Sequence, residues 1–255
     1  MAKIIAFTNQ KGGVGKTTTC VNLSAFLAEM GKKVLIVDVD PQGNATSGVG
    51  VPKGKNLKTI YNVICEQCDI SEVVQLTQIK GLEIIPATVE LAGAEIDLVR
   101  MSGRERILRN CLEKIRASYD YICIDCPPSL GLLTVNALTA ADAIIIPIQC
   151  EFYALEGVSQ LINTVRLIRS QGLNPGLDID GVLLTMKDSR STLTEQVANE
   201  ILKFFGKKVF KTKIPRNIRL AEAPSHGMPI TVYDRRCSGA IAYEQLTKEF
   251  LERQR

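Results

Sequence analysis

The chain has 255 residues, of which 45% are hydrophobic and 23% charged, and its formal net charge at pH 7 is +4. This composition is typical of a globular protein with a substantial core, and no stretch approaches the roughly 18 uninterrupted apolar residues of a membrane span. The first residues, Met1-Ala2-Lys3, lead into a strand pattern rather than a signal peptide, so we expect a cytoplasmic location.

The first predicted elements are a strand at residues 3–8 and a helix at residues 17–30, and a glycine-rich loop joins them. Its glycines allow the backbone to fold around a polyphosphate with several N–H groups pointing inward, Lys16 adds a positive charge, and Thr17 offers a hydroxyl to Mg²⁺. The sequence therefore predicts a phosphate-binding loop and a nucleotide site. The loop reads Lys11-Gly12-Gly13-Val14-Gly15-Lys16-Thr17-Thr18.

This loop departs from the usual G-x-x-x-x-G-K-[ST] pattern, because Gln10 stands at the first glycine position and Lys11 precedes the glycines. In that departure it resembles the deviant P-loop ATPases, a family that includes the ParA/Soj partition proteins, the division-site regulator MinD and nitrogenase iron protein. The resemblance implies that residues 11–18 bind ATP with Mg²⁺. It also implies that Lys11 crosses a dimer interface to the nucleotide of the other subunit, which would make hydrolysis depend on dimerisation.

The second predicted strand, residues 33–38, is followed by Asp38-Val39-Asp40, in which the two carboxylates share a face if the chain stays extended. A carboxylate at the end of a strand can orient a water for attack on the γ-phosphate, because phosphoryl transfer depends on positioning and charge. In the deviant P-loop ATPases the residue that matches Asp40 has this role. The alternative is that Asp40-Pro41 only forms a turn or a helix cap.

Strands at residues 82–86 and 121–125 follow, with a helix at 103–117 between them. The later strand ends in Ile124-Asp125, an apolar run closed by an acid that matches the Walker B pattern. Asp125 would hold Mg²⁺, directly or through water, together with Thr17. Pro127-Pro128 stops the strand and fixes the segment after it.

Strand and helix patterns continue to alternate to the end of the chain, which indicates a parallel sheet with helices on both faces. We therefore expect an α/β fold with one doubly wound, mostly parallel sheet, of the P-loop NTPase type. No low-complexity linker or repeat divides the sequence, so residues 1–255 are predicted to form one domain. The remaining predicted strands are 143–148, 179–185 and 209–214, and the remaining helices are 132–140, 155–170, 193–205 and 240–252.

The loop after the last predicted strand, Pro215-Arg216-Asn217, is a candidate base-binding segment. An asparagine amide both donates and accepts hydrogen bonds, as an adenine edge requires. In ParA-like proteins the matching loop closes over the base, so Pro215 and Asn217 are predicted to contact ATP. A plain turn is the competing interpretation.

A run of basic residues between 203 and 219 contains no acidic residue and is a plausible footprint for a polyanion, or otherwise a solvated face. The segments Thr185-Met186-Lys187-Asp188-Ser189-Arg190 and Arg219 to Gly227 are similar to segments of Soj-type ParA proteins. In those proteins, arginines matching Arg190 and Arg219 bind DNA nonspecifically once ATP has driven dimerisation, and we add Arg216 as a candidate. The basic residues of the run are Lys203, Lys207, Lys208, Lys211, Lys213, Arg216 and Arg219.

The eight cysteines include two C-x-x-C pairs, Cys65/Cys68 and Cys123/Cys126, which lie too far apart in sequence for an ordinary four-cysteine zinc site. Buried reduced thiols are the expectation, and iron–sulfur ligation is the alternative. The single histidine, His226, is predicted to lie in an exposed turn without a catalytic role.

The last segment tests the resemblance to MinD, whose C-terminus is an amphipathic membrane-targeting helix. Here Tyr243, Leu246 and Phe250 have helical spacing, but three glutamates would face an anionic membrane. We expect this helix to pack against the sheet, and we expect no membrane partner.

Together these features predict a weak ATPase of the ParA/Soj type that forms an ATP sandwich dimer and binds double-stranded DNA nonspecifically. Lys11, Lys16 and Asp40 would be its catalytic residues. The resemblance implies a role in chromosome or plasmid partition, association with the nucleoid, and a ParB-like partner that stimulates hydrolysis. The alternatives are a MinD-type membrane-associated regulator and a P-loop ligase or kinase such as dethiobiotin synthetase.

Overall fold

A computed structural model describes residues 1–54, 56–66, 68–151, 154–187 and 192–254. Its centre is a seven-stranded sheet in the order β3-β4-β2-β5-β1-β6-β7, in which every pairing is parallel except that of β3 with β4. The predicted doubly wound, mostly parallel α/β fold is thereby confirmed. The strands are β1 (Lys3–Phe7), β2 (Val34–Asp38), β3 (Gln75–Leu76), β4 (Leu82–Ile85), β5 (Tyr121–Asp125), β6 (Ala143–Gln149) and β7 (Asp178–Thr185).

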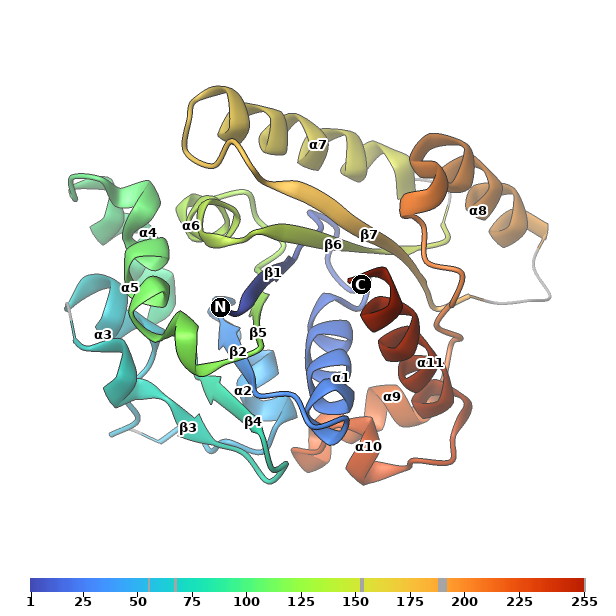
Figure 1. The fold of residues 1–255 in the computed structure, drawn as a ribbon, viewed down its shortest axis with the longest axis horizontal. Helices are drawn as coiled ribbons and strands as arrows, with labels where there is room; N and C mark the ends of the chain where they lie inside the picture. The colour runs from blue at the N-terminus through green and yellow to red at the C-terminus, as the bar shows by residue number, and fades with distance from the viewer. Residues whose placement is uncertain (55, 67, 152–153, 188–191, 255) are drawn as a thin grey trace.

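Helices connect the strands and cover both faces of the sheet (Figure 1). The longer ones are α1 (Lys16–Glu29), α4 (Leu91–Val99), α5 (Ile107–Ile115), α6 (Leu132–Ala140), α7 (Ala154–Ser170), α8 (Thr192–Phe205) and α11 (Ser238–Arg253). The shorter ones are α2 (Asn44–Gly48), α3 (Ile60–Cys65), α9 (Ile218–Glu222) and α10 (Ile230–Tyr233). Short 3₁₀ turns lie at Ile70–Val73, Arg104–Arg106, Arg116–Ser118, Gly206–Lys208 and Ala223–His226.

Two hydrophobic cores lie on opposite faces of the sheet because successive strand residues point to opposite sides. In β1, Ile4 and Ala6 belong to the core beneath α3 to α8, whereas Ile5 and Phe7 belong to the core beneath α1 and α11. Both sets are fully buried, so the strand is apolar from Ile4 to Phe7 and does not alternate with polar residues there. This explains why continuous runs of Val, Ile and Leu predicted most of the strands correctly.

The register of the three central strands aligns the ends that carry the predicted site. Phe7 of β1 pairs with Asp125 of β5, and Asp125 pairs with Asp38 of β2. The backbone of the next residues continues this alignment, since the amide of Val39 donates to the Asp125 carbonyl at 3.0 Å. The three segments that leave these strands therefore start side by side at the carboxyl ends of the strands.

The predicted strand at residues 209–214 is wrong. The amides of Phe210 and Ile214 donate to the carbonyls of Val182 and Leu184 of β7, but no continuous ladder forms. The bridges near this segment are isolated ones, Val182 with Val209 and Lys187 with Pro215. The amides of Lys211 and Thr212 instead donate to the carboxylate of Glu249 on α11, at 2.8 and 2.9 Å. A side chain from another element thus takes the hydrogen bonds that a regular ladder would need.

The predicted helix at residues 103–117 is interrupted. The structure has a 3₁₀ turn at Arg104–Arg106, the helix α5 at Ile107–Ile115 and a second 3₁₀ turn at Arg116–Ser118. Five short elements were not predicted, namely β3 and the helices α2, α3, α9 and α10, each of six residues or fewer. The helix α4 was also missed, because its sequence LAGAEIDLV contains a glycine and carries exposed Ile96 and Val99 on its outer side.

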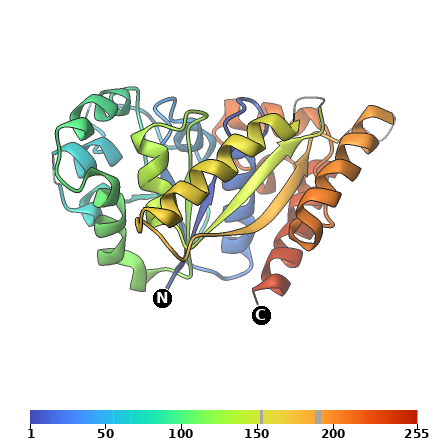
Figure 2. The ribbon, with the colours of Figure 1, turned by 90° about the horizontal axis from the view of Figure 1, so that it is seen from above.

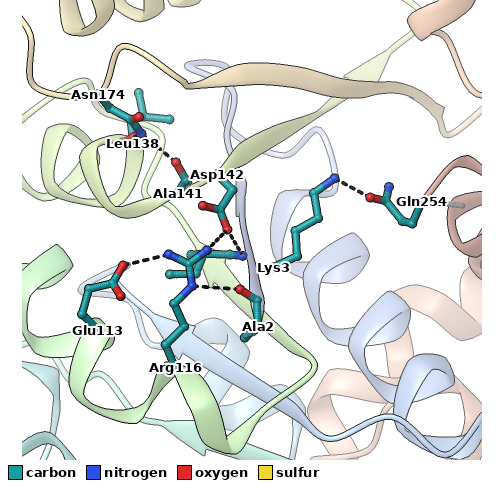
Figure 3. Close-up of polar contacts among 10 residues, drawn as sticks. Ala2, Lys3, Glu113, Arg116, Leu138, Ala141, Asp142, Asn174 and Gln254 are labelled. Carbon is teal, nitrogen blue, oxygen red and sulfur yellow. Dashed lines mark hydrogen bonds and ion pairs between the residues drawn. The ribbon is translucent and has the colours of Figure 1, made fainter.

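At the end of the sheet opposite the predicted site, Arg116 and Asp142 form a group of hydrogen bonds and ion pairs, called the clamp below (Figure 3). Arg116 donates to the Ala2 carbonyl at 2.9 Å and forms ion pairs with Asp142 at 2.6 Å and Glu113 at 2.8 Å. The same Asp142 oxygen accepts the amide of Ile4 at 2.8 Å. Both chain termini lie on this side of the molecule, as Figure 2 shows.

The helix α11 packs as predicted, since Tyr243, Leu246 and Phe250 are buried in the core beside α1. His226 is exposed and stacks on Tyr233, with ring centroids 5.0 Å apart, as expected for a surface turn. Within the described stretches, no helix combines the length and the apolar character needed to cross a membrane.

The cysteines differ from the expectation in part. Cys20, Cys123, Cys126 and Cys150 are buried, whereas Cys65, Cys68, Cys111 and Cys237 are only partly buried, and all eight are free thiols. Burial raises the pKa of Cys123 to about 12, so this thiol is protonated at neutral pH. Among the described residues, no group of three or more His, Cys, Asp or Glu side chains is arranged to hold a metal.

Candidate functional site

The glycine-rich loop wraps the start of α1 at the end of β1. Gly13 and Gly15 have φ angles of 73° and 87°, in the left-handed region that glycine occupies without strain. Gly15 is the N-cap of α1, and its carbonyl accepts the amide of Thr19 at 2.9 Å to start the helix. Val14 is buried and anchors the loop, while Gly12 and Gly13 are exposed. The first amides of α1 have no partner within the helix, and such amides are the donors that an anion site uses.

Lys16 is the buried cation of this loop. Its ammonium donates to the carbonyl of Lys11 at 3.2 Å and thereby holds the two ends of the loop together. Burial lowers the pKa of Lys16, and the nearby carboxylates of Asp125 and Asp40 oppose this effect. A negatively charged ligand at the same place would further favour the protonated form of the lysine.

The structure brings Thr17 and Asp125, the two predicted magnesium ligands, into direct contact. The Thr17 hydroxyl donates to Asp125 Oδ2 at 2.7 Å, whereas the buried Asp125 Oδ1 has no hydrogen-bond partner among the described residues. Burial raises the pKa of Asp125, and the neighbouring Asp38 raises it further. An unpartnered buried carboxylate oxygen beside a hydroxyl is an oxygen donor set of the kind that Mg²⁺ prefers, so these residues fit that ion.

Asp38 and Asp40 occupy different environments although the sequence grouped them. Asp40 lies at the phosphate loop, where its carboxylate accepts the amide of Gln42 at 2.9 Å. Asp38 is fully buried, and burial raises its pKa while hydrogen bonds from Thr46 oppose that effect. Of the two, only Asp40 lines the cavity over the loop. The structure therefore separates one carboxylate that faces the site from one that supports it.

The support of Asp38 comes from Thr46, a residue that sequence reasoning missed. The amide and the hydroxyl of Thr46 both donate to Asp38 Oδ2, at 2.8 and 2.7 Å, and the hydroxyl accepts the amide of Ala87 at 2.9 Å. The other oxygen of Asp38 accepts the amide of Asp40 at 3.2 Å. This chain of hydrogen bonds ties the segments after β2 and β4 to the position of Asp40. No spacing in the sequence links Thr46 to Asp38.

Two adjoining cavities lie over the loop. The first, of about 310 Å³, is lined by the glycines, Lys16, Thr17, Asp40 and Pro128, and could take phosphates. The second, of about 430 Å³, is mostly apolar and is lined by Pro215, Asn217, Leu220 and Tyr243 among others. Its size and lining could take a purine base.

The predicted base contacts lie at this second cavity, but Asn217 also has a structural role. Its Oδ1 accepts the amide of Arg219 at 2.8 Å and caps the helix α9, and its Nδ2 donates to Ser238 Oγ at 2.8 Å. Both interpretations of this loop, as a turn and as a cavity wall, therefore describe it. The residue is held in one orientation by these two bonds.

Lys11 lies at the outer side of the loop and is paired within its own chain. Its ammonium is 2.5 Å from Glu151 Oε2, and the two side chains are 36% and 48% exposed. Glu151 was missed, although it follows β6 and the strand-end rule that selected Asp40 and Asp125 applies to it equally. Among the described residues, Lys16 lines the phosphate cavity and Lys11 does not.

Two of the three candidate DNA contacts, Arg216 and Arg219, lie in the described part of the chain. Arg190 lies outside the described residues. Arg216 is exposed, and Arg219 is half exposed and paired with Glu222 at 3.0 Å and Asp234 at 3.6 Å. The basic run is therefore less uniform in space than in sequence, since Lys208 also pairs with Asp178 and Lys203 with Glu200.

The arrangement can bind a polyphosphate and orient a water at its end. The amides of the loop, Lys16 and the head of α1 supply positive potential, while Thr17 and Asp125 supply oxygen ligands for a cation. Asp40 lines the same cavity, and its carboxylate is a hydrogen-bond acceptor of the kind that can orient a water. This set of groups suits phosphoryl transfer, in which positioning and charge stabilisation dominate.

Comparisons with known proteins agree with this geometry. Residues 2–179 match a family model described as an AAA domain. The chain is 58% identical to the sporulation initiation inhibitor protein Soj of Bacillus subtilis, over 98% of both chains. It is 50% identical to the chromosome partitioning protein ParA of Myxococcus xanthus, over 99% of this chain and 89% of that protein.

A solved structure of similar fold has a nucleotide. It is that of a cobyrinic acid a,c-diamide synthase from Mycobacterium smegmatis with bound ADP and magnesium, which superimposes with a TM-score of 0.86 at 37% identity. The match covers 100% of this chain and 96% of that one.

Proposed function

This chain belongs to the ParA/Soj family of chromosome-partitioning ATPases, and we propose that it hydrolyses ATP as a dimer and binds DNA nonspecifically in the ATP-bound state. The observation that carries the proposal is the Thr17–Asp125 hydrogen bond beside Lys16, with a buried carboxylate oxygen left free for a cation. Such a site serves a nucleoside triphosphate with Mg²⁺, and the solved structure of similar fold has ADP and magnesium bound.

The residues of this chain would divide the work as follows. The amides of the loop and Lys16 bind the phosphates, and the hydroxyl of Thr17 and the carboxylate of Asp125 hold Mg²⁺, which neutralises charge on the phosphates when bound. Asp40 accepts a hydrogen bond from the attacking water and orients it. The apolar cavity beside Pro215 and Asn217 takes the adenine and excludes water from that side.

Lys11 would supply the positive charge that the loop of its own chain lacks on the open side. In this structure its side chain is 36% exposed, and among the described residues its ammonium has a surface ion pair with Glu151, a kind of contact worth about 0–1 kcal/mol. So weak a contact leaves Lys11 available to the nucleotide of a second copy. A cation delivered in this way stabilises the charge that develops during transfer, so turnover would require two subunits.

DNA binding would follow from dimerisation. Arg190, Arg216 and Arg219 are the proposed contacts, and pairing of two copies would double the number of phosphate contacts available to one DNA segment. We place the protein on the nucleoid in the cytoplasm, with a ParB-like partner that stimulates hydrolysis and releases it. This part rests on the relatives named Soj and ParA and on the exposed basic groups.

An electrophoretic mobility shift with unrelated double-stranded DNA tests the proposal. Each sample contains Mg²⁺ with ATP, ADP or no nucleotide, at about 50 and 200 mM salt. We expect a shift with ATP only, which weakens at the higher salt because counterion release drives the binding. A shift that is equally strong with ADP would refute the switch.

Vesicle binding and ATP turnover, measured on the same protein, separate the rival functions. A MinD-type protein would bind anionic vesicles with ATP and ignore DNA, although here the apolar side of α11 is buried against α1. A ligase or kinase would turn over ATP only when a small metabolite is added. ATP hydrolysis that needs neither DNA nor a metabolite, and that rises with protein concentration, favours the dimeric ATPase.

A further inference from the structure

One residue beside the candidate site has a strained backbone. Met186 has a φ of 49°, and among the described residues it is the one non-glycine residue with a positive φ. The left-handed region is unfavourable for a residue with a Cβ, such as methionine, and a glycine at this place would avoid the strain. Strained residues of this kind cluster at ligand sites, where the surrounding structure maintains them.

The surroundings of Met186 hold it in this conformation from both sides. Before it, the hydroxyl of Thr185 donates to the carbonyl of Val14 in the phosphate loop, at 2.8 Å. After it, the amide of Lys187 donates to the carbonyl of Ile214 at 2.9 Å, next to the base-cavity segment. The end of β7 is therefore fixed to the phosphate loop on one side and to the base loop on the other.

The side chain of Met186 lies at the junction of the two cavities. It lines both the phosphate cavity and the base cavity, a property that it shares only with Gly15 and Thr18 among their described lining residues. Its methyl carbon lies 4.0 Å from the place that a Cβ on Gly15 would occupy. A nucleotide that spans the two cavities must pass this junction with its sugar.

We propose that Met186 is a nucleotide-contacting residue whose thioether packs against the sugar and the adjoining edge of the base. The proposal rests on the ATP site described above and adds a residue to it. A flexible, polarisable thioether adapts to a sugar and makes favourable contacts with an aromatic ring. The left-handed backbone then has a purpose, because it turns this side chain over the phosphate loop while the chain continues to the base loop.

Three variants separate this role from a purely structural one. Met186→Gly keeps the backbone conformation and relieves its strain, but it removes the side chain. Met186→Leu keeps an apolar side chain of similar size, and Met186→Asn places a polar residue that tolerates the left-handed region. Thermal unfolding without nucleotide should show Met186→Gly to be at least as stable as the natural protein.

The binding measurement uses calorimetric titration with MgATP, MgADP and inorganic tripolyphosphate with Mg²⁺. We expect Met186→Gly and Met186→Asn to weaken ATP and ADP binding by about fivefold to tenfold, and Met186→Leu to change it by less than about threefold. Tripolyphosphate lacks sugar and base, so its affinity should be unchanged in all three variants.

The outcomes are distinct. Equal ATP affinity in Met186→Gly and the natural protein, or an equal loss for ATP and tripolyphosphate, would overturn the role assigned to Met186. Failure of the natural protein to bind MgATP would instead refute the proposed ATP site itself.

Discussion

At the scale of single residues, the site combines groups that oppose folding in the absence of a ligand. Asp125 and Asp38 are fully buried and lie in register on adjacent strands, and burial raises the pKa of both. A raised pKa in the folded state means that the folded protein binds more protons than the unfolded chain. The contribution of these groups to stability is therefore lost as the pH rises through their folded pKa values.

This predicts that Asp125→Asn makes the ligand-free protein more stable at neutral pH. The amide keeps the shape and can still contact Thr17, but it cannot take up the negative charge that burial and Asp38 disfavour at this place. We expect a gain of about 1–2 kcal/mol in the free energy of unfolding at pH 8, and a smaller gain at pH 5.

Denaturant unfolding with EDTA and without nucleotide measures this difference. Glu252→Gln, which removes an exposed charge on α11, serves as the control and should change stability little. Magnesium nucleotide should stabilise the natural protein but not Asp125→Asn. A variant that is less stable than the natural protein at pH 8 would show that the buried carboxylate is compensated in the free state.

At the scale of elements, Thr46 connects three segments that no local signal joins. Its hydroxyl lies between the carboxylate at the end of β2 and the amide of Ala87 after β4. We predict that Thr46→Val destabilises the fold by about 1–3 kcal/mol, because the buried amide of Ala87 loses its acceptor. Thr46→Ser should recover most of this loss, since it retains the hydroxyl. Denaturant unfolding of the pair measures it, and equal stability of the two variants would contradict the prediction.

The clamp at the opposite end of the sheet is a second test of element packing. Asp142→Ala removes the carboxylate that accepts the Ile4 amide and forms an ion pair with the guanidinium of Arg116. We expect a loss of about 2–4 kcal/mol in the free energy of unfolding, with nucleotide affinity unchanged because the phosphate loop lies at the other end of β1. Glu113→Ala, which removes only the more exposed partner of Arg116, is the matched control and should cost less than about 1 kcal/mol.

The sequence predicted the elements whose signal is local. Six of the seven observed strands and helices such as α6 and α7 were found, because continuous apolar runs and helical spacing record burial directly. β3 has two residues and was missed for lack of any pattern. The segment 209–214 looked like a strand, but Glu249, 35 or more residues away in sequence, takes its amides.

The site was predictable to a similar extent. The glycine-rich loop, Asp40 and Asp125 follow from motifs and from the rule that ligands bind at the ends of parallel strands. Thr46 and Met186 were beyond reach, because one depends on a hydrogen bond across elements and the other on a backbone angle. Seven strands were predicted and seven are observed, but only because the wrongly predicted strand at 209–214 offsets the missed strand β3.

At the scale of the whole molecule, the proposed mechanism requires two copies of the chain. We predict that Lys11→Ala binds MgATP with nearly normal affinity but loses about tenfold or more of its hydrolysis rate, because the residue acts on the partner's nucleotide. Phosphate release at several protein concentrations measures it, and Lys248→Ala, an exposed lysine on α11, is the control. Normal turnover in Lys11→Ala would remove this residue from the mechanism.

Glu151→Gln tests the contact that holds Lys11 in the single chain. Since a surface ion pair is worth little, its removal should shift the concentration at which the ATP-bound protein dimerises by less than about fivefold. Sedimentation at graded concentrations checks this. A larger shift would mean that the pair restrains the monomer.

The two outer strands of the sheet, β3 and β7, affect how the protein behaves at high local concentration. One edge ends in the two-residue antiparallel β3, and along the other edge the segment 209–214 makes only broken contact with β7. Long unpaired strands are templates for aggregation. The strand β3 has only two residues, and the amides of Phe210 and Ile214 cover part of the outer side of the eight-residue edge strand β7. Copies of the chain at high local concentration would therefore meet a very short strand at one edge and a partly covered strand at the other.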